Sequence, residues 1–72
     1  MQVNDMFTSK GRFHPVRVRL TDGFTGTVVL YNRQGGFIQI NGRDTSGKFS
    51  LRVVPVSDPL FTDAVVINPD KV

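Results

Sequence analysis

Alternation of apolar and polar side chains predicts a series of short β-strands along most of this chain. In the first, Val16, Val18 and Leu20 are separated by Arg17 and Arg19. Successive side chains of a strand point to opposite faces of the sheet. The spacing therefore predicts an apolar face and, opposite it, a face that carries two guanidinium groups.

Four further strands are predicted, and residues typical of turns separate them. Their ranges are 24–31, 37–40, 48–54 and 64–67. Gly23 ends a tight turn after the first strand, because glycine accepts a positive φ without a Cβ clash. Gly26 interrupts the second strand and indicates a sharp bend. The segment between Pro55 and Pro59 cannot pair regularly, and residues 41–47 are predicted to form a polar loop.

The N-terminal residues 1–12 have a different pattern. Val3, Met6 and Phe7 are spaced so that one helical turn presents all three together, among polar neighbours. We predict a short helix or an arm here, and one β domain over residues 13–72.

Composition supports strands and limits the architecture. Val, Ile and Thr supply 20 of 72 residues, against one Ala and no Glu. An open sheet of five strands would leave an apolar face exposed. The predicted fold is all-β: a small, strongly bent, five-stranded antiparallel barrel.

The chain offers few groups for catalysis. It has no Cys and one His, which argues against disulfides, a zinc site or a nucleophilic centre. Four aspartates lie beside turn residues, where a carboxylate caps its own backbone: Asp22, Asp44, Asp58 and Asp70. We expect no enzyme activity, no catalytic residue, no metal and no cofactor. Because apolar runs are far shorter than the roughly 20 residues of a membrane span, we expect no membrane association and a cytoplasmic protein. We also expect no small-molecule substrate.

A net charge of +3 permits an anionic partner. Arg17 and Arg19 share a strand face, and Arg52 lies on the polar face of the fourth strand. The remaining cations considered are on the arm or at turns: Lys10, Arg33, Arg43 and Lys48. These side chains either contact phosphates or solubilise the outer face and discourage edge pairing.

The order of a short N-terminal segment and five strands resembles the Sm-like family, which includes the bacterial Hfq proteins. The residues that carry the resemblance are Leu20-Thr21-Asp22-Gly23, Gly26, Val28, Tyr31, Asn32 and the terminal strand 63–67. The resemblance implies a barrel of the Sm-like or SH3 type. It also implies binding of single-stranded nucleic acid, RNA rather than DNA, through the turn formed by Asn32, Arg33 and Gln34. Tyr31, Arg17, Arg19 and Arg52 complete the expected contact set.

The resemblance also implies a homo-oligomer. Two strands with apolar residues on both faces need cover, and pairing with the next subunit would supply it. The expected interface residues are Val53, Val54, Val65, Val66 and Ile67. A head-to-tail contact of this kind closes into a ring, for which the family suggests roughly five to seven subunits.

Two alternatives stay open. Gln34 stands where the family places a base-stacking side chain, and the basic pair between the last two strands is absent. These departures favour a structural or protein-interaction module, for example of phage or mobile-element origin, without nucleic-acid binding. The sequence from Thr25 to Asn32, followed by Gly36-Phe37, is also similar to the N-terminal part of cold-shock domains, which are OB barrels that bind single-stranded nucleic acid.

Overall fold

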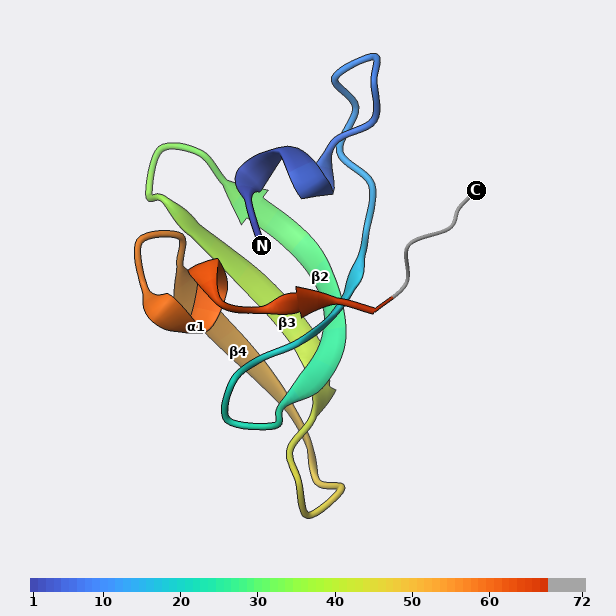
Figure 1. Cartoon of the computed structure of the whole chain (residues 1–72), viewed down its shortest axis with the longest axis vertical. Coiled ribbons are helices and arrows are strands. Elements are labelled where there is room, and N and C mark those ends of the chain that lie inside the picture. The colour runs from blue at the N-terminus through green and yellow to red at the C-terminus, as the bar shows by residue number, and fades with distance from the viewer. Residues whose placement is uncertain (68–72) are drawn as a thin grey trace.

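The computed structural model describes residues 1–67 (Figure 1). A 3₁₀ turn, η1 (Val3–Met6), precedes the strands, and one short helix, α1 (Pro59–Thr62), lies between the last two. The strands are β1 (Arg17–Arg19), β2 (Thr25–Asn32), β3 (Phe37–Arg43), β4 (Phe49–Pro55) and β5 (Val65–Val66). The all-β prediction and its five strands are confirmed.

All strands belong to one antiparallel sheet with the order β4-β3-β2-β1-β5. The sheet is strongly bent, as predicted, but it does not close into a barrel. Within residues 1–67, β4 and β5 form its two edges, and α1 lies against β4 between them in the chain. Closure would need β4 to pair with β5, whereas β5 in the described residues pairs only with β1, over two residues.

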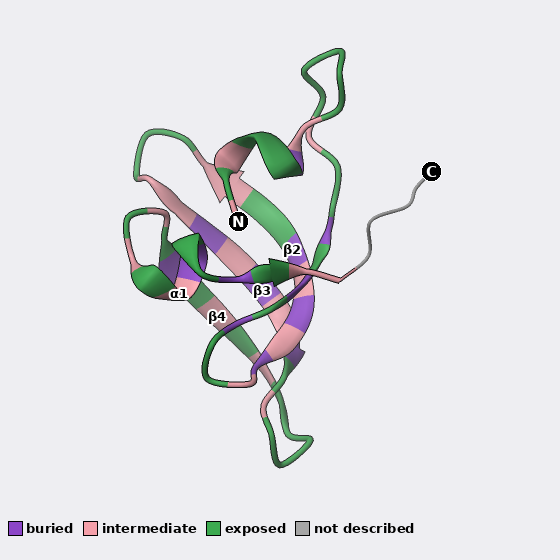
Figure 2. Cartoon of the chain, in the orientation of Figure 1, coloured by how far each residue is buried: buried purple, intermediate pink, exposed green. Residues whose placement is uncertain are grey.

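The inner face of the bent sheet holds the core (Figure 2). In the first strand region, Val16, Val18 and Leu20 are buried while Arg17 and Arg19 are exposed, as the alternation predicts. The other buried apolar side chains are Met6, Phe24, Val28, Ile38, Ile40, Val54, Phe61 and Ala64. Each strand except β5 contributes at least one side chain to this cluster, and Val66 of β5 packs against it.

A pair of glycines lets β2 and β3 approach closely near the start of β2. Gly26 lies opposite Gly42 in the register, and both are buried. A Cβ atom on Gly26 would lie 2.7 Å from the Cα of Gly42. The predicted loop over residues 41–47 was therefore too long: β3 continues to Arg43, because this pairing outweighs the loop-like composition of its last residues.

The N-terminal arm is part of the folded unit. Met6, in η1, is fully buried, and Phe7 forms a bridge with Phe13 on the returning chain. The backbone nitrogen of Met1 donates to the carbonyl oxygens of Thr62 (2.8 Å) and Ala64 (3.0 Å). The predicted short helix is thus a 3₁₀ turn that covers one end of the core.

The proline-bracketed segment forms a turn and α1. Asp58 caps the helix by accepting from the backbone N–H of Leu60 at 2.8 Å, and Pro59 occupies the first turn, where its missing N–H is harmless. Phe61 is buried by this helix. The fifth strand, predicted over residues 64–67, is reduced to Val65–Val66.

Candidate functional site

The residues predicted to contact nucleic acid lie in three separate places. Arg17 and Arg19 project from the outer face of β1. Asn32 ends β2, Arg33 and Gln34 follow it in the β2–β3 turn, and Tyr31 precedes it on β2. Arg52 lies on β4, and both Tyr31 and Arg52 are half-buried in contacts within the chain. The structure therefore does not bring the predicted set together on one surface.

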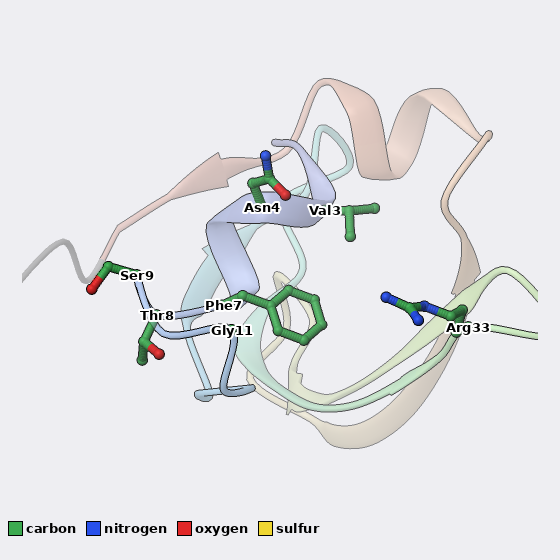
Figure 3. A pocket seen from close by; sticks show the side chains of 7 residues that line it. All are labelled: Val3, Asn4, Phe7, Thr8, Ser9, Gly11 and Arg33. Carbon is green, nitrogen blue, oxygen red and sulfur yellow. The ribbon is translucent and has the colours of Figure 1, made fainter.

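The β2–β3 turn contributes to a pocket of about 500 Å³ beneath the N-terminal arm, which we call the arm pocket. Its lining residues are Val3, Asn4, Phe7, Thr8, Ser9, Gly11 and Arg33. Figure 3 shows the side chain of Arg33 reaching from the turn toward Val3 and the ring of Phe7. Asn32 holds the turn in shape, since its Oδ1 accepts from the backbone N–H of Gly35 at 2.6 Å.

Aromatic packing fixes the ring that forms one wall of the arm pocket. Phe7 meets Phe13 and Tyr31 edge to face, with ring centroids 6.0 Å and 5.9 Å apart. Edge-to-face pairs hold ring orientations. Tyr31, predicted as a contact residue, thus supports Phe7 from the side, and Phe7 is the aromatic residue that borders the pocket.

Arg52 has partners within the chain. Its guanidinium forms an ion pair with Asp22 and lies 4.5 Å from the centroid of the Phe24 ring. The hydrogen bond from Arg52, followed by that from the Phe24 backbone N–H, lowers the pKa of the Asp22 carboxyl below its ordinary value. Arg52 therefore covers the edge of the core and fixes the turn before β2.

The outer face of the sheet carries a second hollow of about 300 Å³, which we call the outer groove. Its lining residues are Arg17, Thr25, Gly26, Thr27, Asn41, Gly42, Arg43 and Phe49. They come from four adjacent strands and point away from the core, apart from the two glycines, which expose backbone. Of the predicted contact residues, Arg17 belongs to this groove.

The described carboxylates are largely engaged at turns, as predicted. Asp44 accepts from the Ser46 hydroxyl and from the backbone N–H groups of Ser46 and Lys48. These bonds, led by the Ser46 hydroxyl, lower the pKa of the Asp44 carboxyl. The capping roles of Asp22 and Asp58 are confirmed in the same way. Asp70 lies outside the described residues.

The cations have few partners, by contrast. Nine Lys and Arg residues occur in the sequence, and Lys71 lies outside the described part. Among the other eight, Arg52 alone lies within salt-bridge distance of a carboxylate in residues 1–67. Several described carboxylates are thus engaged by turn hydrogen bonds, and the other seven described cations face solvent.

The predicted interface residues divide by burial. On β4, Val53 is 55% exposed while Val54 is buried in the core of its own chain. On β5, Val65 is 57% exposed, and Val66 packs against the core. Ile67 follows β5, and its backbone N–H donates to the Arg17 carbonyl at 2.9 Å. Val53 and Val65 are therefore the members of this set that one subunit offers most fully to another.

An apolar row on the outer side of β4 adds to these positions. Phe49, Leu51 and Val53 are 60%, 54% and 55% exposed, and we call them the β4 row. β4 is an edge strand, so the row lies beside unpaired backbone groups.

In residues 1–67, no helix is long and apolar enough to cross a membrane, and no three metal-ligating side chains gather.

Protein-family models, curated protein sequences and solved structures were compared with the chain. None of them matches it. The geometry of the two hollows and of the β4 row therefore carries the functional argument, and the Sm-like resemblance stays a prediction.

Three residues of these surfaces are not predicted as site residues from the sequence. The spacing of Val3, Met6 and Phe7 assigns Phe7 to the arm, and nothing local indicates that it faces Arg33. Asn41 and Arg43 fall in the predicted loop over residues 41–47. The signal for them was present: Ile38, Ile40 and Gly42 continue one alternation, and extending the strand by that pattern would have placed Asn41 and Arg43 on its outer face.

Proposed function

We propose that the protein binds single-stranded nucleic acid, with RNA preferred, as an oligomer of this small bent-sheet domain. The observation that carries the proposal is the arm pocket, where Arg33 faces the aromatic wall of Phe7 (Figure 3). A guanidinium group and an aromatic face are the two elements that single-strand binding sites combine, one for phosphate and one for a base.

The lining of the arm pocket suits an unpaired nucleotide. Asn4, Thr8 and Ser9 add amide and hydroxyl groups, which pair with base edges or ribose oxygens. Thr8 already accepts from the backbone N–H of Arg12, which keeps the arm in its hairpin. No carboxylate lines the pocket, so nothing there repels a phosphate.

Charge across the described surface supports the same partner. Seven of the eight described cations lack a carboxylate within salt-bridge distance. Binding to a polyanion would release counterions from the phosphates these groups neutralise, and the affinity would then fall as salt rises.

Titration of fluorescently labelled oligo-U and oligo-A by the full chain, at low and at physiological salt, tests the proposal. We expect binding at low salt that weakens as salt rises. Arg33→Gln should reduce the affinity and the salt slope together. Phe7→Leu keeps an apolar wall but loses the aromatic face, at a cost of about 1–3 kcal/mol for one stacked base.

Lys10→Gln is the matched control. It removes one charge from the exposed tip of the arm, outside the lining of the pocket, and should weaken binding less than Arg33→Gln. A thermal melt of each variant confirms that it is folded. Absence of binding to either oligonucleotide at low salt would refute the proposal.

The oligomer rests on the two sheet edges. β4 and β5 present unpaired backbone groups, and Val53 and Val65 lie exposed on them. Pairing of β4 with β5 of the next subunit would satisfy these groups and cover both side chains. The contact is head to tail, so it gives a ring where the rotation closes.

A second candidate function is favoured by the β4 row. Three exposed apolar side chains on one edge strand suit a structural module whose partner is protein. Light scattering at micromolar concentration separates the candidates when read beside the titration. Assembly without nucleic-acid binding selects the structural module, and a stable monomer removes it together with the oligomer.

Leu51→Asp is the variant for this test. Leu51 is exposed in one subunit, so the carboxylate introduced there would be buried only in an assembly. His14→Asp adds the same charge at an exposed position before β1, outside the β4 row, and is the control. Dissociation by Leu51→Asp alone supports edge assembly.

A further inference from the structure

The outer groove combines side chains from four strands in two rows. Strand pairing places Arg19, Thr25 and Arg43 in one row and Arg17, Thr27 and Asn41 in the next. All six side chains lie on the face of the sheet away from the core. Phe49, opposite Arg43 on β4, extends the first row to the edge.

Sheet geometry sets the spacing of the arginines. Neighbouring strands lie about 4.8 Å apart, and residues on one face of a strand repeat every ~6.6 Å. Arg19 on β1 and Arg43 on β3 have one strand between them, so two inter-strand spacings separate their Cα atoms by about 10 Å, and Arg17 is about 12 Å from Arg43 on the diagonal. Arginine side chains of that separation can converge on one phosphate group between them.

The electrostatics of the groove favour an anion. Its lining contains two guanidinium groups and no carboxylate. Arg43 donates one hydrogen bond, to the carbonyl oxygen of Gly47 at 3.0 Å, and lies 5.8 Å from the centroid of the Phe49 ring. A guanidinium has five N–H donors, so most of them remain free for a ligand.

The polar groups between the arginines are also underused. Oδ1 of Asn41 is shielded from solvent and has no hydrogen-bond partner. The Thr25 hydroxyl makes one long bond, 3.4 Å, to the Gly23 carbonyl. Buried polar atoms are normally paired, so an amide left without a partner beside two arginines indicates a place where another molecule supplies one.

The geometry points to a nucleotide site in the outer groove, with the phosphate held by Arg17 and Arg43 and the base against Phe49. Asn41 and the threonine hydroxyls face the ribose or the base edge. This site goes beyond the arm pocket: it begins at the first residues of β2, and about 20 Å of bent strand separates it from the turn that carries Arg33. The ligand is either a free nucleotide or one nucleotide of a single strand.

Amide chemical shifts of the ¹⁵N-labelled full chain test the site with three probes: inorganic phosphate, uridine monophosphate and oligo-U. We expect the nucleotide to shift amides at Thr25–Thr27 and Asn41–Arg43 saturably, and to bind more tightly than inorganic phosphate because Phe49 contacts the base. Arg43→Gln and Arg17→Gln should each lower the affinity for uridine monophosphate by about tenfold, as expected for loss of a hydrogen bond to a charged group.

Arg12→Gln is the matched control, because it removes the same exposed charge outside the lining of both hollows and should leave these shifts unchanged. Shifts with oligo-U but not with the mononucleotide identify a strand contact, and shifts with the mononucleotide alone identify a free-nucleotide site. The second result, combined with no oligonucleotide binding in the titration, would show that the groove stands while nucleic-acid binding through the arm pocket fails.

Absence of groove shifts with all three probes on the unmodified protein would overturn the site, and so would shifts that survive both arginine substitutions. Where a glutamine variant does not fold, Arg17→Lys and Arg43→Lys keep the charge and lose the planar fork. They should then weaken binding of the nucleotide and of inorganic phosphate alike, because both probes present the phosphate group that the fork contacts.

Discussion

Replacing Gly26 with Ala tests the close approach of β2 and β3 that forms the floor of the outer groove. A Cβ atom at this position would lie 2.4 Å from the carbonyl oxygen of Asn41 and 2.7 Å from the Cα of Gly42. Both are backbone atoms, so rotation of a side chain cannot relieve the contact. Because ordinary contact begins at 3.4 Å, the strands must move apart by about 1 Å, the difference between 3.4 and 2.4 Å.

The cost follows from that displacement. Overpacking alone typically costs about 1–3 kcal/mol. Separation also weakens the ladder beside the pair, where Thr25 lies opposite Arg43 and Thr27 opposite Asn41, and each weakened hydrogen bond adds about 0.5–1.5 kcal/mol. We expect a loss of about 3 kcal/mol or more. A domain of this length has about 4–11 kcal/mol in total, so the variant should be marginally folded.

Thermal and urea unfolding, followed by circular dichroism, measure the effect. A loss of about 3 kcal/mol lowers the melting temperature by about 12–24 °C for a domain of this size. Gly42→Ala should behave alike, since its Cβ would lie 2.1 Å from the carbonyl oxygen of Thr25. The double variant should cost less than the two single losses together, because one separation relieves both contacts.

Gly11→Ala is the control for glycine replacement itself. Gly11 has a φ of +80° and no atom within 4 Å of its would-be Cβ, so only backbone strain opposes the change, about 1–2 kcal/mol. Gly26 does not have a positive φ and lacks that penalty. If Gly26→Ala melted as high as Gly11→Ala, the steric argument would be wrong.

Three further predictions concern stability. The pKa of Asp22 is lowered in the folded protein, so the stability that this carboxylate contributes is present above its ordinary pKa of 3.8 and is lost as the pH falls through the lower folded value. The urea concentration at the unfolding midpoint should therefore decrease as the pH drops below about 4, and it should decrease less in Asp22→Asn. Asp58→Ala removes the cap of α1 and should cost about 1 kcal/mol in urea unfolding; no change would contradict the capping role. Met6→Ala should cost about 2–5 kcal/mol, because Met6 is fully buried; a loss below about 1 kcal/mol would show that the arm is not part of the cooperative unit.

The sequence predicted best where structure is decided locally. Val16, Val18 and Leu20 alternate with arginines, and a period of two leaves one choice of face once the arginines are assigned to solvent. Gly23 lies at a φ of +93°, the conformation that makes glycine suitable for that turn. The carboxylate of Asp22 caps a backbone N–H two residues on, an interaction that neighbouring residues determine.

Prediction failed where distant pairing decides. The Asn-Gly-Arg segment at residues 41–43 has loop composition, yet it continues β3 because Gly42 meets Gly26 across the sheet. Barrel closure was expected from the need to cover an apolar face. In the structure η1, α1 and the residue before β5 supply that cover with Met6, Phe61 and Ala64, and closure of β4 on β5 is not required.

The candidate sites show the same division. Arg17 and Arg19 were placed on one face correctly, because both belong to a single strand. The neighbours that turn Arg17 into part of a groove come from β3 and β4, and only the register of the whole sheet brings Arg43 and Phe49 to it. Phe7 reaches the arm pocket through edge-to-face contacts with residues 6 and 24 positions further along the chain, namely Phe13 and Tyr31.

The orientation of β4 shows how alternation can leave the more important question open. Phe49, Leu51 and Val53 alternate with Ser50, Arg52 and Val54, and a period of two does not say which set faces inward. Arg52 decides it: its guanidinium packs on the Phe24 ring and pairs with Asp22, which commits the Arg52 face to the core side. The more apolar set is thereby left outside. Since exposed apolar residues on an edge strand favour pairing with another chain, the ion pair that stabilises one subunit also presents the surface through which subunits would meet.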